Sequence, residues 1–324
     1  MLTYVVRRLL YSVVVLIVAS FIVFAGVSSV SHPLAFLKMQ PNASKQTIEN
    51  ITKRKHLDDP IPVRYVYWVR DAATRGFGTD TIRDQPIMPD LKRVMGHTLQ
   101  LVLVAESLAV LIAVAIGVYS ALRQYSVTDY AATTFSFVGL ATPVFWLALM
   151  LQVLFVNIYL WFDVRIFYTA NLSSVDPGSG LHWVLDRVQH MALPWMTLMV
   201  ATIAAYSRFM RAAMLEVVNS DFIRTARAKG LSERRVTMNH AFRNALIPLV
   251  TVIALNFGAL LSGAVVTETV FGLDGMGLYF INALNAGDPY PIMAWLMVTA
   301  TLVITFNLIA DIAYGYLDPR VRFD

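Results

Sequence analysis

The segment of residues 221–235, DFIRTARAKGLSERR, carries seven charged side chains in a chain that is otherwise strongly apolar. A single Arg or Lys at mid-depth in a bilayer costs about 2.5–3.5 kcal/mol on insertion scales, so this segment must face water. Phe222, Ile223 and Ala226 would give its first helix a small apolar face that could dock on another protein. The open alternative is a solvated loop whose basic residues only set the orientation of the chain in the membrane.

Motifs for enzyme chemistry are absent from the sequence. It contains no G-x-x-x-x-G-K-[ST] phosphate loop, no H-E-x-x-H and no G-x-S-x-G. The six histidines lack ligand spacing, and no cysteine is present to serve as nucleophile, disulfide or zinc ligand. We expect no catalytic residue, no cofactor and no metal here. Membrane-embedded hydrolase or transferase chemistry stays an unsupported alternative.

The composition is that of an integral membrane protein. Of the 324 residues 57% are hydrophobic and 15% charged, with a mean hydropathy of +0.60. A soluble domain has about 45–50% apolar and about 25% charged residues. The net charge of +5 does not indicate a nucleic-acid partner, because basic residues that border apolar segments are explained by membrane topology.

Six apolar runs are long enough to cross ~30 Å of hydrocarbon at 1.5 Å per residue. The first follows Arg7 and Arg8, and its length favours an uncleaved anchor over the alternative of a cleaved signal peptide. The sequence therefore predicts an all-α integral membrane protein with six transmembrane helices. The expected spans are residues 9–30, 98–121, 131–160, 191–213, 247–270 and 292–316.

The distribution of Lys and Arg predicts the orientation. With a cytoplasmic N-terminus, thirteen basic residues lie in cytoplasmic stretches, and the outer segments after the third and fifth helices hold only Arg165 and Arg187. We therefore expect both termini in the cytoplasm. The expected divisions are a cytoplasmic N-terminus with the first helix (1–30), an extracytoplasmic segment (31–97), a transmembrane core (98–316) that includes a cytoplasmic loop (214–246), and a cytoplasmic tail (317–324).

The charged segment has the local pattern of helix, turn and helix. Asp221 suits the start of the first helix, and Arg227 suits its end, because each complements the helix dipole. Gly230 is placed as a left-handed residue that ends this helix. Ser232 would then cap the next helix, with Glu233 in its first turn.

The stretch DFIRTARAKGLSERRVTMNHAFRNALIPLV resembles the cytoplasmic loop of membrane subunits of ATP-binding-cassette importers, in the form typical of the dipeptide and oligopeptide permease family. In that family the loop is a helical elbow that fits a cleft on the ATPase subunit. The chain keeps Ala226 and Gly230 of the broader importer signature but departs from its Glu-Ala at Arg224 and Thr225, as the peptide branch commonly does. The resemblance implies an ATPase-coupling loop comprising Asp221, Phe222, Arg224, Thr225, Ala226, Arg227, Lys229, Gly230 and Leu231.

Further motifs extend the resemblance over nearly the whole chain. HLDDPIPVRYVYWVRDAATRGFGTD is similar to the family's segment after the first helix, GHTLQL to the start of its second helix, and ATPVFW to its third-helix proline motif. ETVFGLDGMG and NLIADIAYGYLDPRVR resemble its last two helices and its Asp-Pro-Arg tail. The chain departs from the family at Gly76, where an acidic residue is common, and at Asp274, where proline is common; AGDPYP is a looser match.

The resemblance implies a type I importer permease fold, a place in the inner membrane of a bacterial cell, and a set of partners. These are a second homologous permease subunit, two cytoplasmic ATPase subunits that bind ATP and Mg, and an extracytoplasmic solute-binding protein. The implied solute is a peptide, with nickel chelates, glutathione and small peptide-like conjugates as rivals. A membrane scaffold that recruits a partner without transport is an alternative of another class.

Polar residues and prolines within the spans are candidates for a translocation path. Glu106 is expected to face a bundle interior or an aqueous cavity, because lipid exposure of an ionisable group is costly. Asn157 and Asn256 are equally explained as links between helices, worth ~0.6–2 kcal/mol. Proline permits kinks and unwound turns, and the resemblance favours Pro143 for a pathway role. The other prolines within or at the mouths of spans are Pro194 and Pro248.

The segment 31–97 contains aromatic residues interleaved with charges. Tyr65, Tyr67, Trp68 and Phe77 suit a small folded platform against which a binding protein would rest. The alternative is a partly ordered connector.

Overall fold

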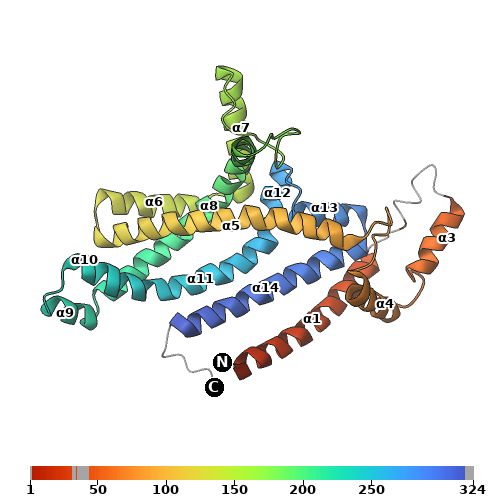
Figure 1. Cartoon of the computed structure of the whole chain (residues 1–324), viewed down its shortest axis with the longest axis horizontal. Coiled ribbons are helices and arrows are strands. Elements are labelled where there is room, and N and C mark those ends of the chain that lie inside the picture. Colours follow the sequence, from red (N-terminus) through yellow and green to blue (C-terminus); the bar gives the residue numbers. More distant parts are fainter. Residues whose placement is uncertain (1, 31–33, 35–43, 318–324) are drawn as a thin grey trace. The chain divides into compact units, whose positions relative to one another are not determined.

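A computed structural model describes residues 2–30, 34 and 44–317. Regular structure in this part of the chain is helical, apart from one isolated antiparallel bridge between Thr79 and Pro86. Figure 1 traces the helices in chain order. They are α1 (Leu2–Val30), α3 (Lys45–Arg54), α4 (Ile61–Arg75), α5 (Ile87–Leu122), α6 (Val127–Ala141), α7 (Val144–Phe162), α8 (Leu181–Val218), α9 (Asp221–Ala228), α10 (Glu233–Arg235), the π-helix η1 (Val236–Ala241), α11 (Phe242–Gly263), α12 (Val265–Phe271), α13 (Met276–Ala286) and α14 (Pro289–Leu317).

Six helical segments of the described chain are long and apolar enough to cross a membrane, which confirms the predicted number. They are Val6–Val30, Ile87–Leu122, Val144–Phe162, Leu181–Val218, Glu233–Gly258 and Pro289–Ile309. The expected tail at 317–324 lies outside the described residues, except for Leu317.

The expected third span, residues 131–160, is not one helix. It consists of α6 and α7, separated by Thr142 and Pro143. Thr142 has extended backbone angles, φ −80° and ψ 119°, because the ring of a following proline disfavours the helical conformation. Pro194 and Pro248, in contrast, lie inside the continuous helices α8 and α11. Of the three prolines, only Pro143 marks a break.

Other helix ends also differ from the sequence-based expectation. α5 begins at Ile87 and α8 at Leu181, about ten residues before the expected starts at 98 and 191. The expected fifth span, 247–270, is divided between α11 and α12 at Ala264. Hydropathy predicts only the apolar stretch, whereas helical hydrogen bonding continues through the polar turns beside it.

The chain forms two compact units. Unit 1 comprises Met1–Thr98 and Asp274–Ile304, and unit 2 comprises Leu99–Leu273 and Thr305–Asp324. In unit 1 three of the four aromatic residues predicted to form a platform face inward: Trp68 is 2% exposed, and Tyr65 and Phe77 pack in the same cluster, whereas the half-buried Tyr67 stacks on His56. This part of the segment is folded. The buried members of the cluster are Phe24, Trp68, Ile87, Leu91, Val94, Met276, Tyr290, Met293 and Ala294.

Unit 2 is held by close helix packing at small residues. A Cβ added at Gly117 of α5 would lie 2.6 Å from Met210 Cβ and 2.7 Å from the Ser207 carbonyl oxygen, both on α8. One added at Gly139 of α6 would lie 3.0 Å from Ala204 Cβ, also on α8. Small residues let membrane helices approach closely, so α5 and α6 both pack tightly on α8.

Candidate functional site

The elbow predicted from the charged segment is present in unit 2. Helix α9 begins after Ser220, whose backbone is extended, and the Thr225 hydroxyl donates to the Asp221 carbonyl at 2.9 Å. Gly230 has φ +76°, the left-handed conformation expected for it. Ser232 occupies the N-cap of α10 with extended backbone, but it makes no side-chain capping bond, in contrast to the prediction.

The apolar face of α9 is used differently from the expectation. Ile223 is fully buried and Ala226 nearly so, and both pack in a core with Met210 and Met214 of α8. Phe222 is 48% exposed. Two of the three residues expected to dock on a partner therefore fix α9 to its own chain. The pattern shows which face is apolar but not what covers it.

Charged side chains dominate the outer surface of the elbow. Arg227 Nε donates to Glu233 Oε1 at 2.8 Å across the turn at Gly230, and Arg224 lies 3.5 Å from Asp221. The backbone closes the turn, since Lys229 N–H donates to the Thr225 carbonyl at 3.1 Å. The exposed residues of the elbow are Asp221, Phe222, Arg224, Thr225, Arg227, Ala228, Lys229 and Gly230, with Leu231 half-buried.

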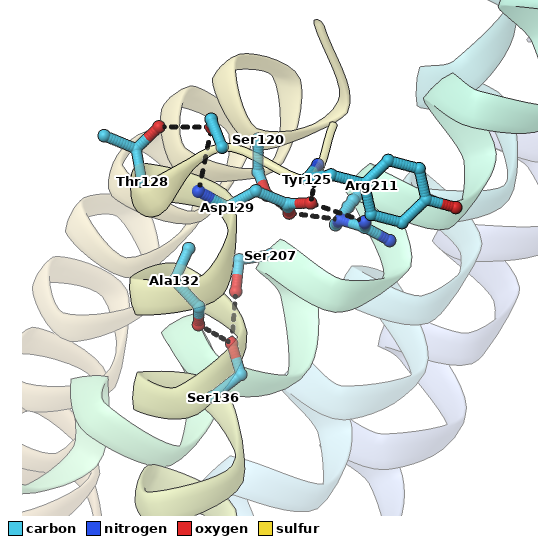
Figure 2. A network of polar contacts seen from close by, with 9 residues as sticks. Ser120, Tyr125, Thr128, Asp129, Ala132, Ser136, Ser207 and Arg211 are labelled. Carbon is cyan, nitrogen blue, oxygen red and sulfur yellow. Dashed lines mark hydrogen bonds and ion pairs between the residues drawn. The ribbon is translucent and has the colours of Figure 1, made fainter. Parts of the chain in front are cut away.

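A partly buried ion pair, with Asp129 buried and Arg211 half-buried, lies between α6 and α8, and the sequence interpretation did not single it out (Figure 2). Arg211 donates through Nε to Asp129 Oδ1 at 2.6 Å and through a terminal nitrogen to Oδ2 at 2.8 Å. The Tyr125 N–H donates to Oδ2 at 2.9 Å, and the Ser120 hydroxyl donates to Oδ1. The Arg211 guanidinium beside Asp129 holds the pKa of that carboxyl below its usual range.

One signal in the sequence could have pointed to this pair. Ser126 and Asp129 have the S-x-x-D spacing of a helix start before an apolar run, and Ser126 Oγ accepts from the Asp129 N–H at 3.3 Å. An acidic residue fixed at the mouth of a span needs hydrogen-bond donors, and a basic side chain is one such partner. The partner, Arg211, is 82 residues away, and only the fold brings the two together.

Glu106 belongs to a buried polar trio of α5, α8 and α11. The Tyr206 hydroxyl donates to Glu106 Oε1 at 2.5 Å, and Asn256 Nδ2 donates to the Tyr206 oxygen at 2.9 Å. Glu106 is only 4% exposed, and within the described chain its Oε2 has no hydrogen-bond partner. Of the pathway candidates, the fold brings Glu106 and Asn256 together. Asn157 lies half-buried on α7, outside the trio.

Unit 1 contains a buried carboxylate of another kind. Asp288 accepts from the Thr81 N–H at 2.5 Å, from the Thr81 hydroxyl at 2.9 Å and from the Tyr290 N–H at 3.1 Å. Burial raises the pKa of Asp288, and these donors only partly oppose that effect. Asp288 thereby joins the loop before α5 to the start of α14. It lies in the AGDPYP stretch, which the sequence interpretation left without a role.

Lys55 strengthens the same join. Its ammonium donates to the Thr79 hydroxyl at 2.8 Å and to the Thr79 carbonyl, and it lies 4.6 Å from the centre of the Tyr290 ring. Burial lowers the pKa of Lys55. Among the described residues, no group of three or more His, Cys, Asp or Glu is placed to hold a metal ion.

Comparison with known proteins identifies two matching family models. Residues 113–323 match the binding-protein-dependent transport system inner membrane component, and residues 1–86 match the N-terminal component of the same kind of system.

Three curated relatives align over nearly their full length. The oligopeptide transport system permease protein AppB of Bacillus subtilis is 37% identical, covering 100% of both chains. OppB of Mycobacterium bovis is 38% identical, covering 98% of each chain. The dipeptide permease DppB of Alkalihalophilus pseudofirmus is 34% identical, covering 100% of each.

A solved structure supports the fold. An inward-facing form of the MetNI methionine ABC transporter superposes with a TM-score of 0.56 at 16% identity, covering 72% of this chain and 99% of that chain. At this identity the likeness concerns the fold alone. It agrees with the importer permease fold implied by the motifs.

Proposed function

The chain belongs to the family of binding-protein-dependent transport system inner membrane components, and from that premise we propose that it is the permease subunit of an ATP-driven peptide importer. It is a multi-pass membrane protein, and its full-length relatives are named as oligopeptide and dipeptide permeases. Their names favour peptides over nickel chelates or glutathione as the solute.

One observation carries the proposal: an exposed, charged elbow is fixed to a long membrane-spanning helix by a buried apolar contact. Ile223 and Ala226 share one buried apolar core with Met210 and Met214, so a force on the outer surface of α9 would reach α8 through that core. The chain has no phosphate loop of its own. The energy of ATP must therefore enter through a partner chain.

We assign the partners accordingly. Two cytoplasmic ATPase subunits, which bind ATP and Mg, receive the elbow of residues 221–231 in a cleft. A second, similar permease completes the path, and an external solute-binding protein delivers the peptide. Closure of the ATPase dimer on ATP moves the elbow, and the spans alternate between inward and outward openings.

This assignment requires both termini in the cytoplasm of a bacterial cell and residues 31–97 outside its inner membrane. Lys53 suits a test because its side chain is 74% exposed, whereas Lys55 is covered by Thr79 and Tyr290. A membrane-impermeant amine label should reach Lys53 in intact spheroplasts. Protection of Lys53 would contradict the orientation.

For the translocation path we propose Glu106, Asn157, Asn256 and the break at Pro143. Glu106 is buried among α5, α8 and α11 in the state described, so contact with a solute requires these helices to separate. Glu106→Gln should then change the uptake of charged peptides more than that of neutral ones, per assembled complex. An equal change for both, with a lower complex yield, would assign Glu106 to structure alone.

Uptake of a labelled alanine peptide by whole cells tests the function. Deletion of the gene should abolish uptake, and a wild-type copy should restore it only while cellular ATP is maintained. Unchanged uptake in the deletion strain would favour the scaffold alternative. Neighbouring genes for a second six-helix chain, an ATPase with a phosphate loop and a secreted binding protein would independently support the importer.

A further inference from the structure

Helices α6 and α8 are fastened together at three successive levels, and the contacts differ in chemistry. At one end the Asp129 carboxylate and the Arg211 guanidinium form a two-pronged ion pair. The Ser136 and Ser207 hydroxyls lie 3.1 Å apart at the next level. At the third level, Gly139 packs against Ala204.

The spacing of these residues shows that the contacts follow one face of each helix. On α6 the three positions are seven and three residues apart, and on α8 they are four and three apart, in the opposite direction. Residues three, four or seven apart lie on the same side of a helix. The two helices therefore meet in antiparallel directions along one face of each, and Figure 2 shows the first two levels.

The same stretch of α8 carries the elbow. Met210 and Met214 flank Arg211 in sequence and pack with the buried side chains of α9. Gly117 of α5 meets Met210 as well. A continuous packed path thus runs from the coupling helix through α8 to α6.

After α6 the backbone changes from helical to extended. α6 ends at Ala141, Thr142 is extended, and α7 begins only after Pro143, which has no N–H to donate. A short extended link between two helices bends more readily than a hydrogen-bonded helix. The break therefore lies where a rigid body formed by α6 and α8 would end.

We propose that Asp129 and Arg211 are positioning residues that lock α6 to α8. With this lock α6, α8 and the coupling helix α9 move as one lever, and bending is confined to Thr142 and Pro143. The proposal rests on the proposed function, because it assumes that the elbow receives movement from an ATPase. A bidentate ion pair suits this role, since sliding by one turn would break both hydrogen bonds and leave the buried Asp129 carboxylate without its charged partner.

The absence of cysteine in the whole chain provides a clean test. In the complete reconstituted complex, Ser136→Cys with Ser207→Cys places two thiols where two hydroxyls now face each other. Oxidation should form a disulfide and leave alanine-peptide uptake within about twofold of the reduced complex, because a contact inside a rigid body does not move. The single-cysteine variants are the matched controls.

Two results would overturn the lever. If oxidation stops uptake and a reductant restores it, α6 and α8 slide during transport. If no disulfide forms, the two helices are not held in this register in the working complex. A wild-type complex without peptide-stimulated ATP hydrolysis would instead contradict the proposed function, so the two failures are distinguishable.

A second arm tests the ion pair itself. Asp129→Asn should lower the peptide taken up per ATP hydrolysed about tenfold, and Arg211→Lys, which keeps the charge but loses one prong, should lower it less. The oxidised disulfide introduced into the Asp129→Asn chain should restore the ratio, because it replaces the lock. An unchanged ratio in Asp129→Asn, or no rescue by the disulfide, would contradict the positioning role.

Discussion

Unit 1 and unit 2 each bury a carboxylate, and they stabilise it in opposite ways. Asp288 in unit 1 is held by neutral N–H and O–H donors, whereas Asp129 in unit 2 faces a guanidinium. Neutral donors fasten a loop without requiring a distant charge. A charge pair also fixes register, because any misalignment leaves both charges unpaired in the protein.

The packing of the two units differs in the same sense. Unit 1 is built around Trp68 and Phe24, with ring centres 5.9 Å apart, as suits a platform that stays in place. Unit 2 has glycines at helix contacts and carries the elbow. This difference motivates the proposal that unit 1 is a static support and that unit 2 transmits movement.

The largest effect is expected in unit 1. Trp68→Ala removes the centre of the aromatic cluster and should cost about 3–5 kcal/mol of stability, as for other buried aromatic residues. Limited proteolysis should then cleave the segment between α3 and α5 faster. Trp161→Ala is the control, because Trp161 is 73% exposed. Equal cleavage rates in the two variants would show that buried Trp68 stabilises unit 1 no more than the exposed Trp161 does.

The glycine of α5 in unit 2 provides the next effect. Gly117→Ala should cost about 1–3 kcal/mol, because its Cβ would meet Met210 and a backbone oxygen of α8. Gly96→Ala, on the same helix but in unit 1, meets nothing within 4 Å and should be neutral or slightly stabilising. The thermal midpoint of the purified complex measures both. A loss of stability in Gly96→Ala as large as that in Gly117→Ala would show that close packing is not specific to unit 2.

Acidification should affect the two carboxylates with opposite signs. The pKa of Asp129 is lower in the folded chain than in the unfolded chain. Ionised Asp129 therefore stabilises the fold above about pH 4, and this contribution is lost as the pH falls through the folded-state pKa. The pKa of Asp288 is higher in the folded chain than in the unfolded chain. Protonated Asp288 therefore favours the fold below about pH 4, and this contribution is lost as the pH rises through the folded-state pKa.

Thermal midpoints of Asp129→Asn and Asp288→Asn against wild type, measured from neutral pH down to about pH 4 and below, separate these effects. The advantage of wild type over Asp129→Asn should shrink as the pH falls below about 4. Relative to Asp288→Asn, wild type should gain stability as the pH falls from neutral. The same trend in both would contradict the contrast between neutral and charged partners.

The smallest effect is expected on the surface of the elbow. Arg227→Glu breaks an ion pair with Glu233 whose two side chains are 41% and 68% exposed, so the loss should be ~0–1 kcal/mol. Peptide-stimulated ATP hydrolysis should fall by less than about fivefold, and the exchange Arg227→Glu with Glu233→Arg should recover it. Complete loss in the single variant, without recovery, would show direct recognition of Arg227 by the ATPase.

Local sequence rules predicted much of this architecture. Hydropathy gave the number of spans, and the spacing of Asp221, Arg227 and Gly230 gave the elbow with its left-handed turn. The sequence indicated that a helix could break at Pro143. It could not show that one helix ends there and another begins, because proline can also lie inside a continuous helix, as Pro194 does in α8.

The remaining features depend on contacts between distant residues. The pairing of Asp129 with Arg211 and of Glu106 with Tyr206 spans 82 and 100 residues, and no local period encodes it. The burial of Ile223 was missed for the same reason, since an amphipathic helix does not reveal whether its apolar face meets its own chain or a partner.

The central claim, that α9 and its turn couple the chain to an ATPase, is tested most directly at Gly230. Its φ of +76° costs a β-branched residue about 1–2 kcal/mol, and apart from its two chain neighbours nothing lies within 4 Å of an added Cβ, so Gly230→Val acts mainly through the backbone. Gly230→Asn is the control, because Asn tolerates this conformation. The measurement is ATP hydrolysis stimulated by peptide-loaded binding protein in reconstituted complexes with normal membrane insertion. We predict that stimulation is lost in Gly230→Val and kept in Gly230→Asn; full stimulation in Gly230→Val would contradict the coupling role and leave the segment as a topology signal.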